Sequence, residues 1–159
     1  ATSAPPRITQ SGAWEVDGLA AGTWAVVGRA ASGGWLRERI EVGVGQVVRK
    51  DLLVQASGSV RVHLVHDDGT PADTVRVVLA TEDGLWRQPD PAGKEAGDLT
   101  WLSDAQGWHR RDGVPSGRLR VTTLPDARRG PAPEVAVEVP PGGTVEVEVV
   151  VPRAPRAVR

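Results

Sequence analysis

The feature that most constrains this chain is one phrase that occurs twice, over residues 12–26 and again over residues 107–121. Glycines take the same places in both copies, so that Gly12, Gly18 and Gly22 correspond to Gly107, Gly113 and Gly117. Glycine at fixed offsets marks turns, because it adopts backbone conformations that other residues avoid. The displacement of about 95 residues is of domain size rather than solenoid-repeat size, so the phrase predicts one β module that occurs at least partly twice.

Apolar and polar residues alternate wherever the chain is regular, most clearly over 135–139 and 145–149, where Val faces one side and Glu the other. This period of two is typical of half-buried strands. Similar runs cover residues 24–29, 36–42, 47–54, 60–65 and 74–80. No stretch keeps apolar residues at helical spacing through a dozen positions. Because Asp-Gly and Pro-Gly turns separate these runs, the chain is predicted to be nearly all β and to form a sandwich.

Composition narrows the classes of partner and site. Cys is absent, so neither a disulfide nor a Cys-ligated metal site can form, and the net charge of −1 gives no electrostatic reason to expect nucleic acid. No apolar run approaches the roughly 20 residues that span a bilayer, and the first residues, Ala-Thr-Ser-Ala-Pro-Pro, contain neither an initiator Met nor a signal-peptide core. A sequence that starts without an initiator Met suggests a mature form or an excerpt of a longer protein.

A family resemblance follows from the order of motifs between Gly58 and Val151. An Asp-Asp-Gly-Thr-Pro turn at 67–71 comes after the first strand, Ser-Asp-Ala-Gln-Gly at 103–107 precedes Trp108, and Asp-Gly-Val-Pro-Ser-Gly at 112–117 leads into Leu-Arg-Val. This order resembles the carboxypeptidase regulatory-like domain, a prealbumin-like β-sandwich related to the B-type repeats of bacterial collagen adhesins. Trp108 stands where that family usually has Phe.

The resemblance implies two β-sandwiches in tandem, prealbumin-like or Ig-like and antiparallel, of which the first is incomplete. Residues 57–153 match the family throughout, whereas residues 1–56 begin only at its middle and lack the early strands, and residues 154–159 form a tail. A sandwich without its early strands would expose unpaired backbone, which folded proteins normally cover. Three explanations stay open: an excerpt, a strand donated by a neighbouring copy, or one larger sandwich that includes residues 1–56.

Candidate chemistry is sparse. Ser103, Asp104 and His109 lie close enough in sequence to suggest a nucleophilic triad, but the resemblance makes this stretch a turn that Ser and Asp cap. His63 and His66 lie three apart in a strand and point to opposite faces, so they do not suit a shared metal. We therefore predict no catalytic residue, no metal site and no cofactor.

Tryptophan offers the remaining candidates, because an exposed indole can stack on a sugar or dock into a partner. Trp14, Trp24 and Trp108 stand where the family buries an aromatic residue, so they are predicted to be core, with the repeated glycines as turns. Trp86 and Trp101 flank a long loop and Trp35 follows a Gly-Gly turn. These three, with Arg128 and Arg129 in a second long loop, are the candidate contacts for a ligand or partner.

The expectation from these observations is a non-enzymatic structural, adhesion or scaffold module of a bacterial surface or secreted protein, located outside the cell or in its envelope. One alternative is a carbohydrate-binding or accessory domain of a secreted hydrolase or peptidase. Another is a self-assembling subunit completed by a strand from a neighbouring copy. The expected partners are neighbouring domains or other copies of the chain, with a glycan or surface protein as a further candidate, and neither nucleic acid nor a transmembrane segment is expected.

Overall fold

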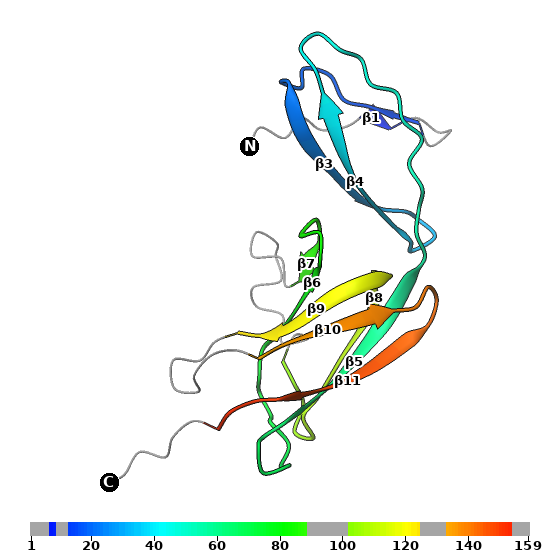
Figure 1. Ribbon diagram of the computed structural model, residues 1–159. Helices are drawn as coiled ribbons and strands as arrows, with labels where there is room; N and C mark the ends of the chain where they lie inside the picture. The colour runs from blue at the N-terminus through cyan, green and yellow to red at the C-terminus, as the bar shows by residue number, and fades with distance from the viewer. Residues whose placement is uncertain (1–6, 9–12, 89–101, 125–132, 154–159) are drawn as a thin grey trace.

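A computed structural model describes residues 7–8, 13–88, 102–124 and 133–153 of the chain. Within these residues all regular structure is β, which confirms the predicted class. Figure 1 shows a long two-stranded ribbon above a two-layered sandwich. No helix in the described part of the chain is long and apolar enough to cross a membrane.

The strands of the described residues follow one another along the chain with short turns between most of them. They are β1 (Arg7–Ile8), β2 (Trp14–Glu15), β3 (Gly22–Arg29), β4 (Trp35–Val42), β5 (Ser57–Val65), β6 (Val77–Thr81), β7 (Arg87–Gln88), β8 (Trp108–Pro115), β9 (Gly117–Thr123), β10 (Glu134–Val139) and β11 (Thr144–Val150).

The sandwich is formed by β5 to β11 in two facing sheets. One sheet has the order β10-β9-β6-β7 and the other the order β11-β5-β8. Most pairs are antiparallel, as predicted, but β11 lies parallel to β5. The first and last strands of the sandwich can run parallel because the chain crosses between the two sheets before it returns to lie beside β5.

The alternation in β5 shows why these residues fold this way. Val60, Val62 and Leu64 are completely buried between the sheets, whereas Arg61 and His63 on the opposite face are partly exposed. Burying a Val or Leu side chain contributes about 1.5–3 kcal/mol each relative to leaving it exposed. Inward residues of the remaining strands and of the segments beside them complete the core, namely Ala72, Val75, Val77, Leu79, Val114, Leu119, Val121, Val137, Val139, Val149 and Val151.

The ribbon consists of β3 and β4, which pair antiparallel along their whole length. A tight turn at residues 30–34 joins them, with the Gly33 N–H donating to the Ala30 carbonyl at 2.8 Å. The segment after β4 was predicted to be a strand over residues 47–54, and this is wrong: it is extended without a ladder. A strand forms when its backbone hydrogen-bonds to a neighbouring strand. Beside this segment the described residues show a single bridge, between Gln55, just beyond it, and Trp35.

The prediction that three tryptophans are core residues is also corrected. Trp14 is 36% exposed on the short strand β2, and Trp24 and Trp108 are only half-buried. Trp108 lies on the outer face of its sheet, where its ring stacks on His63 with centroids 4.4 Å apart. The inward position of β8 belongs to the next residue, His109, which is 4% exposed.

The repeated glycines were predicted to be turn residues; the described ones share a positive φ, but Gly22, Gly113 and Gly117 lie within β3, β8 and β9. Positive φ angles occur at each described member of the two phrases, namely Gly18 (73°), Gly22 (144°), Gly107 (78°), Gly113 (69°) and Gly117 (96°). Gly12 lies outside the described residues. The glycine positions in the phrase therefore predict where the backbone has positive φ, whereas the tryptophan positions in the same phrase do not predict burial.

Candidate functional site at the junction of ribbon and sandwich

Trp35 connects the ribbon to the sandwich. It is the first residue of β4, and its Nε1–H donates to the carbonyl of Gly113 in the sandwich at 2.7 Å. Its ring meets the ring of Trp86 edge-on, with centroids 5.7 Å apart, a geometry that aromatic pairs favour. The Arg29 guanidinium lies 5.5 Å from the centroid of the Trp35 ring. The indole is thus held from two sides at the base of the ribbon.

The backbone around Trp35 is fixed as well. Trp35 exchanges two backbone hydrogen bonds with Gln55, at 2.8 and 2.7 Å. The residue before it must be glycine, because a Cβ on Gly34 would lie 2.6 Å from Val54 Cγ1 and 2.7 Å from the Gln55 carbonyl oxygen. The Gly-Gly turn that the sequence displays before Trp35 therefore lets the chain return closely past the start of β4.

Arg37 makes the second connection. Its side chain is only 11% exposed, and its Nη1 donates to Asp83 Oδ2 at 3.0 Å, with which it forms a salt bridge. Its Nη2 donates to the Ser116 carbonyl at 3.3 Å and to Gln55 Oε1 at 3.4 Å. Arg39, two residues further along the same face of the ribbon, donates to the backbone carbonyl of Asp83 at 2.8 Å.

Hydrogen bonds within its own turn orient Asp83 toward Arg37 and Arg39. Its Oδ1 accepts hydrogen bonds from the Thr81 hydroxyl at 2.5 Å and from the Leu85 N–H at 2.9 Å. Burial opposes ionisation of this carboxyl, but those hydrogen bonds, together with Arg37 and Arg39, outweigh burial and lower the pKa of Asp83 below its usual value. Asp83 is therefore ionised throughout the neutral pH range.

The same turn positions Trp86. The Thr81 hydroxyl accepts from the Trp86 N–H at 3.0 Å, and the Thr81 N–H donates to the Trp86 carbonyl at 2.9 Å. Trp86 also packs against the hydrophobic core of the sandwich. One turn of the sandwich thus supplies both the carboxylate for Arg37 and the aromatic ring for Trp35.

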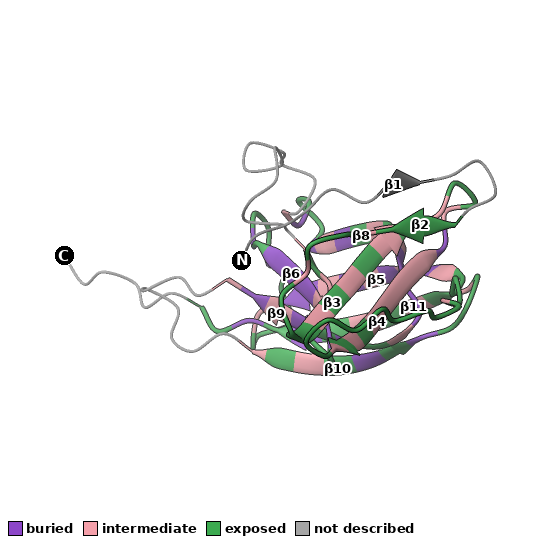
Figure 2. Cartoon of the chain, turned by 90° about the horizontal axis from the view of Figure 1, so that it is seen from above, coloured by how far each residue is buried: buried purple, intermediate pink, exposed green. Residues whose placement is uncertain are grey.

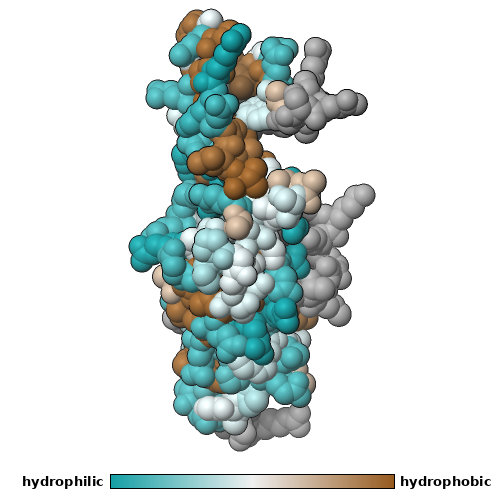
Figure 3. All heavy atoms as spheres, turned by 90° about the vertical axis from the view of Figure 1, so that its right-hand side faces the viewer, coloured by the Kyte–Doolittle hydropathy of each residue, from teal (hydrophilic) through white to brown (hydrophobic). Residues whose placement is uncertain are grey.

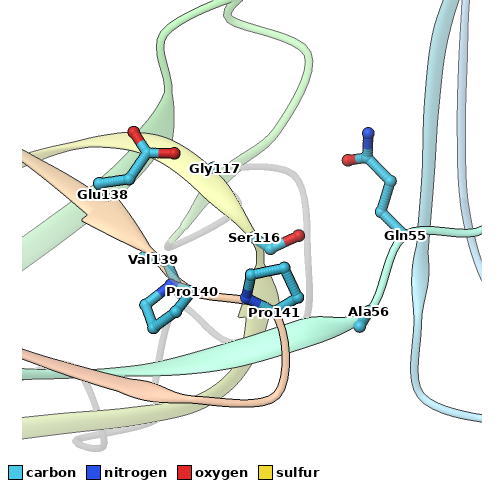
Figure 4. A pocket seen from close by; sticks show the side chains of 8 residues that line it. All are labelled: Gln55, Ala56, Ser116, Gly117, Glu138, Val139, Pro140 and Pro141. Atoms are coloured by element: carbon cyan, nitrogen blue, oxygen red, sulfur yellow. The ribbon is translucent and has the colours of Figure 1, made fainter.

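A shallow hollow of about 410 Å³ lies beside this junction. Figure 4 shows Gln55 and Ala56 on one side of it and Ser116, Pro140 and Pro141 on the other. Gly117, Glu138 and Val139 complete the lining, so Glu138 is its one ionisable side chain.

The candidate triad is a turn, as predicted. The Ser103 hydroxyl, buried, accepts from the Val75 N–H at 2.9 Å and donates to the Ala72 carbonyl at 2.7 Å. Asp104 Oδ1 accepts from the N–H groups of Gln106 and Trp108, at 2.9 and 2.8 Å. Within the described residues, no group of three or more His, Asp or Glu side chains is placed to hold a metal ion.

The structure thus brings together two of the sequence-derived contact candidates, Trp35 and Trp86, and sets them against each other. Trp101, Arg128 and Arg129 lie outside the described residues. Sequence reasoning missed Arg37 and Asp83, which carry the junction's ion pair. The only signal for them was the charge of Arg37 and Arg39 on the face of β4 opposite its apolar residues, and such a charge pattern usually means a solvated face.

Comparisons with known proteins support the fold. No family model matches the chain, and no curated protein matches it. Among solved structures, the minor pilin GBS52 of the Gram-positive pathogen Streptococcus agalactiae is similar with a TM-score of 0.50 and 18% identity, over 82% of this chain and 64% of that one. A streptococcal ancillary pilin gives a TM-score of 0.46 and 14% identity, over 84% of this chain and 45% of that one.

At this identity the likeness to the minor pilin concerns the fold alone, and the chain spans less than two thirds of that protein's length. It supports a β-sandwich of the prealbumin-like or Ig-like type. The narrower label of a carboxypeptidase regulatory-like domain stays a resemblance, carried by the turn motifs at 67–71, 103–107 and 112–117.

Proposed function

We propose that the chain is a non-enzymatic structural module, a stiff spacer, scaffold or adhesion unit of a bacterial surface or secreted protein that works outside the cell or in its envelope. The observation that carries this proposal is the junction, where Trp35 and Arg37 fasten the ribbon to the sandwich. Parts of a chain joined only by a linker move relative to each other by default. A spacer instead needs a fixed angle between successive units, and hydrogen bonds to Gly113, Ser116 and Asp83 would supply it.

The chemistry of the described residues supports a non-enzymatic role. The hollow at the junction is lined chiefly by proline, small residues and a single carboxylate. Ser103, the one serine that the sequence placed near an acid and a histidine, uses its hydroxyl to bond backbone groups of the sandwich. The similar Streptococcus agalactiae structure is described as a minor pilin, which agrees with a surface role. On this proposal residues 1–56 and 57–153 are successive repeats.

Glycan binding receives less support than the structural role. A sugar would need a free indole face, but the rings of Trp35 and Trp86 pack against each other and Trp86 also covers the core. Self-assembly through an added strand has a specific observation in its favour, because β3 pairs with no described strand other than β4; the experiment below distinguishes a second copy at this edge from another segment.

Residual dipolar couplings test the proposed stiffness. Backbone N–H couplings of β3 and β4 and those of β5 to β11 are measured in a weakly aligned, isotopically labelled sample of the chain. A fixed junction predicts that both sets fit one alignment tensor with the same magnitude. Two tensors of clearly different magnitude would show that the parts reorient independently, and the spacer proposal would be abandoned.

A matched pair of variants assigns the stiffness to the junction. Asp83→Asn removes the charge that faces Arg37 and is expected to reduce the couplings of the ribbon relative to those of the sandwich. Glu82→Gln, in the same turn, changes a side chain whose partner is Arg118 within the sandwich, at 3.5 Å, and is expected to leave the ratio unchanged. Equal effects of the two variants would mean that the salt bridge does not set the angle.

A further inference from the structure

The β3–β4 ribbon has the same register as the β9–β10 pair of the sandwich, and the repeated phrase covers part of both β3 and β9. Gly22 at the start of β3 lies opposite Val42 at the end of β4, and Gly117 at the start of β9 lies opposite Val139 at the end of β10. Both glycines have positive φ, 144° and 96°. The β3–β4 pair is therefore the counterpart of the β9–β10 pair, residue for residue.

The turn that follows each pair is also the same. After β4, the Gln46 N–H donates to the Gly43 carbonyl at 3.2 Å, and Gly45 between them has a φ of 66°. After β10, the Gly143 N–H donates to the Pro140 carbonyl at 3.1 Å, and Gly142 has a φ of 70°. Residues 47–54 therefore correspond to β11 and its last neighbour, with Val54 in the place of Val151.

Two strands of the sandwich have little or no counterpart in the described N-terminal residues: for β5 only the two-residue strand β1, which pairs with β2 as β5 pairs with β8, and for β6 none. In the sandwich, β5 lies between β11 and β8 and pairs with both, while β6 pairs with β9. In the N-terminal part, β3 pairs with no described strand other than β4, and residues 47–54 join no ladder. The described residues thus leave two positions open, one beside β3 and one beside residues 47–54.

The exposure of the neighbouring side chains indicates the same two open positions. Leu119 and Val121 of β9 are completely buried, whereas their counterparts Trp24 and Val26 in β3 are only half-buried. At the end of the module Val151 is 2% exposed, but Val54 is 51% exposed. Figure 2 shows β6 in the colour of buried residues and the ribbon strands in those of intermediate and exposed ones.

Apolar side chains also gather on the surface of the open segment. Val44, Val47 and Leu53 are 94, 82 and 86% exposed. Figure 3 shows hydrophobic surface in the upper part of this face of the molecule, where residues 43–54 descend from β4. Their counterparts in the sandwich, Pro141, Thr144 and Val150, are exposed as well, so the uncovered inner face is recorded by Val48 and Val54, which are 37 and 51% exposed.

The free edge of β3 carries none of the features that discourage pairing. Natural proteins protect edge strands with charge, proline or bulges. Residues 22–28 contain neither charge nor proline. The neighbouring strand β4 instead carries Arg37, Glu38, Arg39 and Glu41. Of the two strands, β3 is the one whose edge suits addition of a strand.

We propose that the ribbon and residues 47–54 form an acceptor for one extended two-strand polypeptide segment of the β5–β6 type, which has β-branched or other aliphatic residues at alternate positions. One of its strands pairs antiparallel with β3, as β6 pairs with β9. The other runs parallel to residues 47–54, as β5 runs parallel to β11, and takes the place that β1 holds beside β2. The apolar side chains of the segment, at positions corresponding to Val60, Val62 and Leu64, cover the inner face of the ribbon.

One pair of inner positions differs between the two halves. Where the sandwich has Val135 and Val147, the N-terminal part has Glu38 and Lys50, joined by a salt bridge of 2.8 Å. A bound segment would bury this salt bridge further, and buried charges are tolerated when each has its partner. The acceptor is therefore expected to prefer an aliphatic segment that leaves the pair intact over one that carries a charge of its own at this place.

The test supplies the missing strands from the chain itself. A copy of residues 57–106 is placed ahead of Gly12 in the full chain, in place of residues 1–11, so that Gln106 of the copy joins Gly12 as Gln106 joins Gly107. Amide hydrogen exchange of β3 is then compared with that of the unaltered chain. The proposal expects exchange at the free edge of β3 to slow on the order of tenfold or more, because those amides gain hydrogen-bond partners.

A matched control replaces the aliphatic residues in the added copy alone, as Val60→Thr, Val62→Thr and Leu64→Thr. Threonine keeps the β propensity and nearly the shape of valine but removes the apolar surface, so slow exchange of β3 should be lost. A synthetic peptide of residues 57–81, added to the unaltered chain, repeats the test without altering the acceptor and covers the case in which the longer chain does not fold.

Three results would overturn the proposal. Exchange of β3 that neither the added copy nor the peptide slows would mean that no acceptor exists. Equal slowing by the threonine control would remove the requirement for aliphatic residues. Slow exchange in the unaltered chain, together with a dimer mass by light scattering, would show that a second copy occupies the edge. None of these results depends on the junction's stiffness, so the two proposals fail separately.

Discussion

Replacing Gly107, a buried turn residue, by alanine should destabilise the sandwich far more than the loss of a turn glycine alone. A Cβ at this residue would lie 2.2 Å from the Leu64 carbonyl oxygen and 3.2 Å from the Ala72 nitrogen. Both of those atoms are main chain, so no side chain can move aside. The Ala72 N–H donates to the Leu64 carbonyl at 2.9 Å, and the Leu64 N–H donates to the Gly107 carbonyl at 2.7 Å.

The expected cost has two parts. The left-handed backbone, with φ at 78°, costs a non-glycine residue about 1–2 kcal/mol. Relieving the contact with Leu64 requires the strands to separate, which weakens both hydrogen bonds at about 1 kcal/mol each. Gly107→Ala should therefore lose roughly 3–4 kcal/mol, a large fraction of the 5–15 kcal/mol that stabilises an ordinary domain.

Gly69→Ala is the matched control. Gly69 has the same φ of 78°, but nothing lies within 4 Å of a Cβ built on it, so only the backbone cost of about 1–2 kcal/mol applies. Urea unfolding, followed by tryptophan fluorescence and by circular dichroism, gives the free energy of unfolding of both variants if the two probes coincide. Equal losses in the two variants would refute the claim that close approach to Leu64 fixes this glycine.

Two further predictions concern buried polar groups. Ser103→Ala leaves the Val75 N–H and the Ala72 carbonyl without their partner and should cost roughly 2–4 kcal/mol in urea unfolding, whereas the exposed Ser32→Ala should cost almost nothing. Burial lowers the pKa of His109 below its usual 6.5, so below that pH the unfolded chain binds a proton that the folded chain does not, and stability decreases as pH falls toward the folded-state pKa. His109→Gln should flatten this dependence below the usual pKa of 6.5, and an unchanged slope in urea midpoints would contradict the assignment to His109.

The core of the sandwich could be predicted because the alternation of apolar and polar residues shows which side chains of a strand face inward. In the predicted alternating run over 60–65, the apolar residues Val60, Val62 and Leu64 are all completely buried. Turn positions were predictable for a related reason, since few residues other than glycine adopt positive φ at low cost. Both signals are local, so one sequence suffices to read them.

The burial of aromatic residues could not be predicted in the same way. Whether residue 108 or 109 faces inward depends on how the chain leaves the Gly107 turn, and a shift of one residue exchanges the two faces. Gly107 lies tightly against β5, which puts Trp108 outside on His63 and His109 inside. The family pattern placed an aromatic residue inward at the position that this chain uses for the outer face.

The junction was beyond prediction for a different reason. Trp35 and Trp86 were recognised as unusual, but a single indole gives no indication of what it will contact. They meet because Gln55 pairs with Trp35 and brings the base of β4 beside the turn that carries Asp83 and Trp86. Contacts between parts distant in sequence depend on the whole path of the chain, so they follow only once the fold is known.

Residues 47–54 show that the failure of a strand prediction can be informative. The segment has the composition of a strand and follows the same turn that precedes β11, yet it forms no ladder, because pairing rather than propensity makes a strand. Its counterpart β11 forms one only with β5 beside it. The place where a correct local pattern produced no strand is therefore the place where a partner strand belongs, and the pairing of β11 with β5 gives its direction and register.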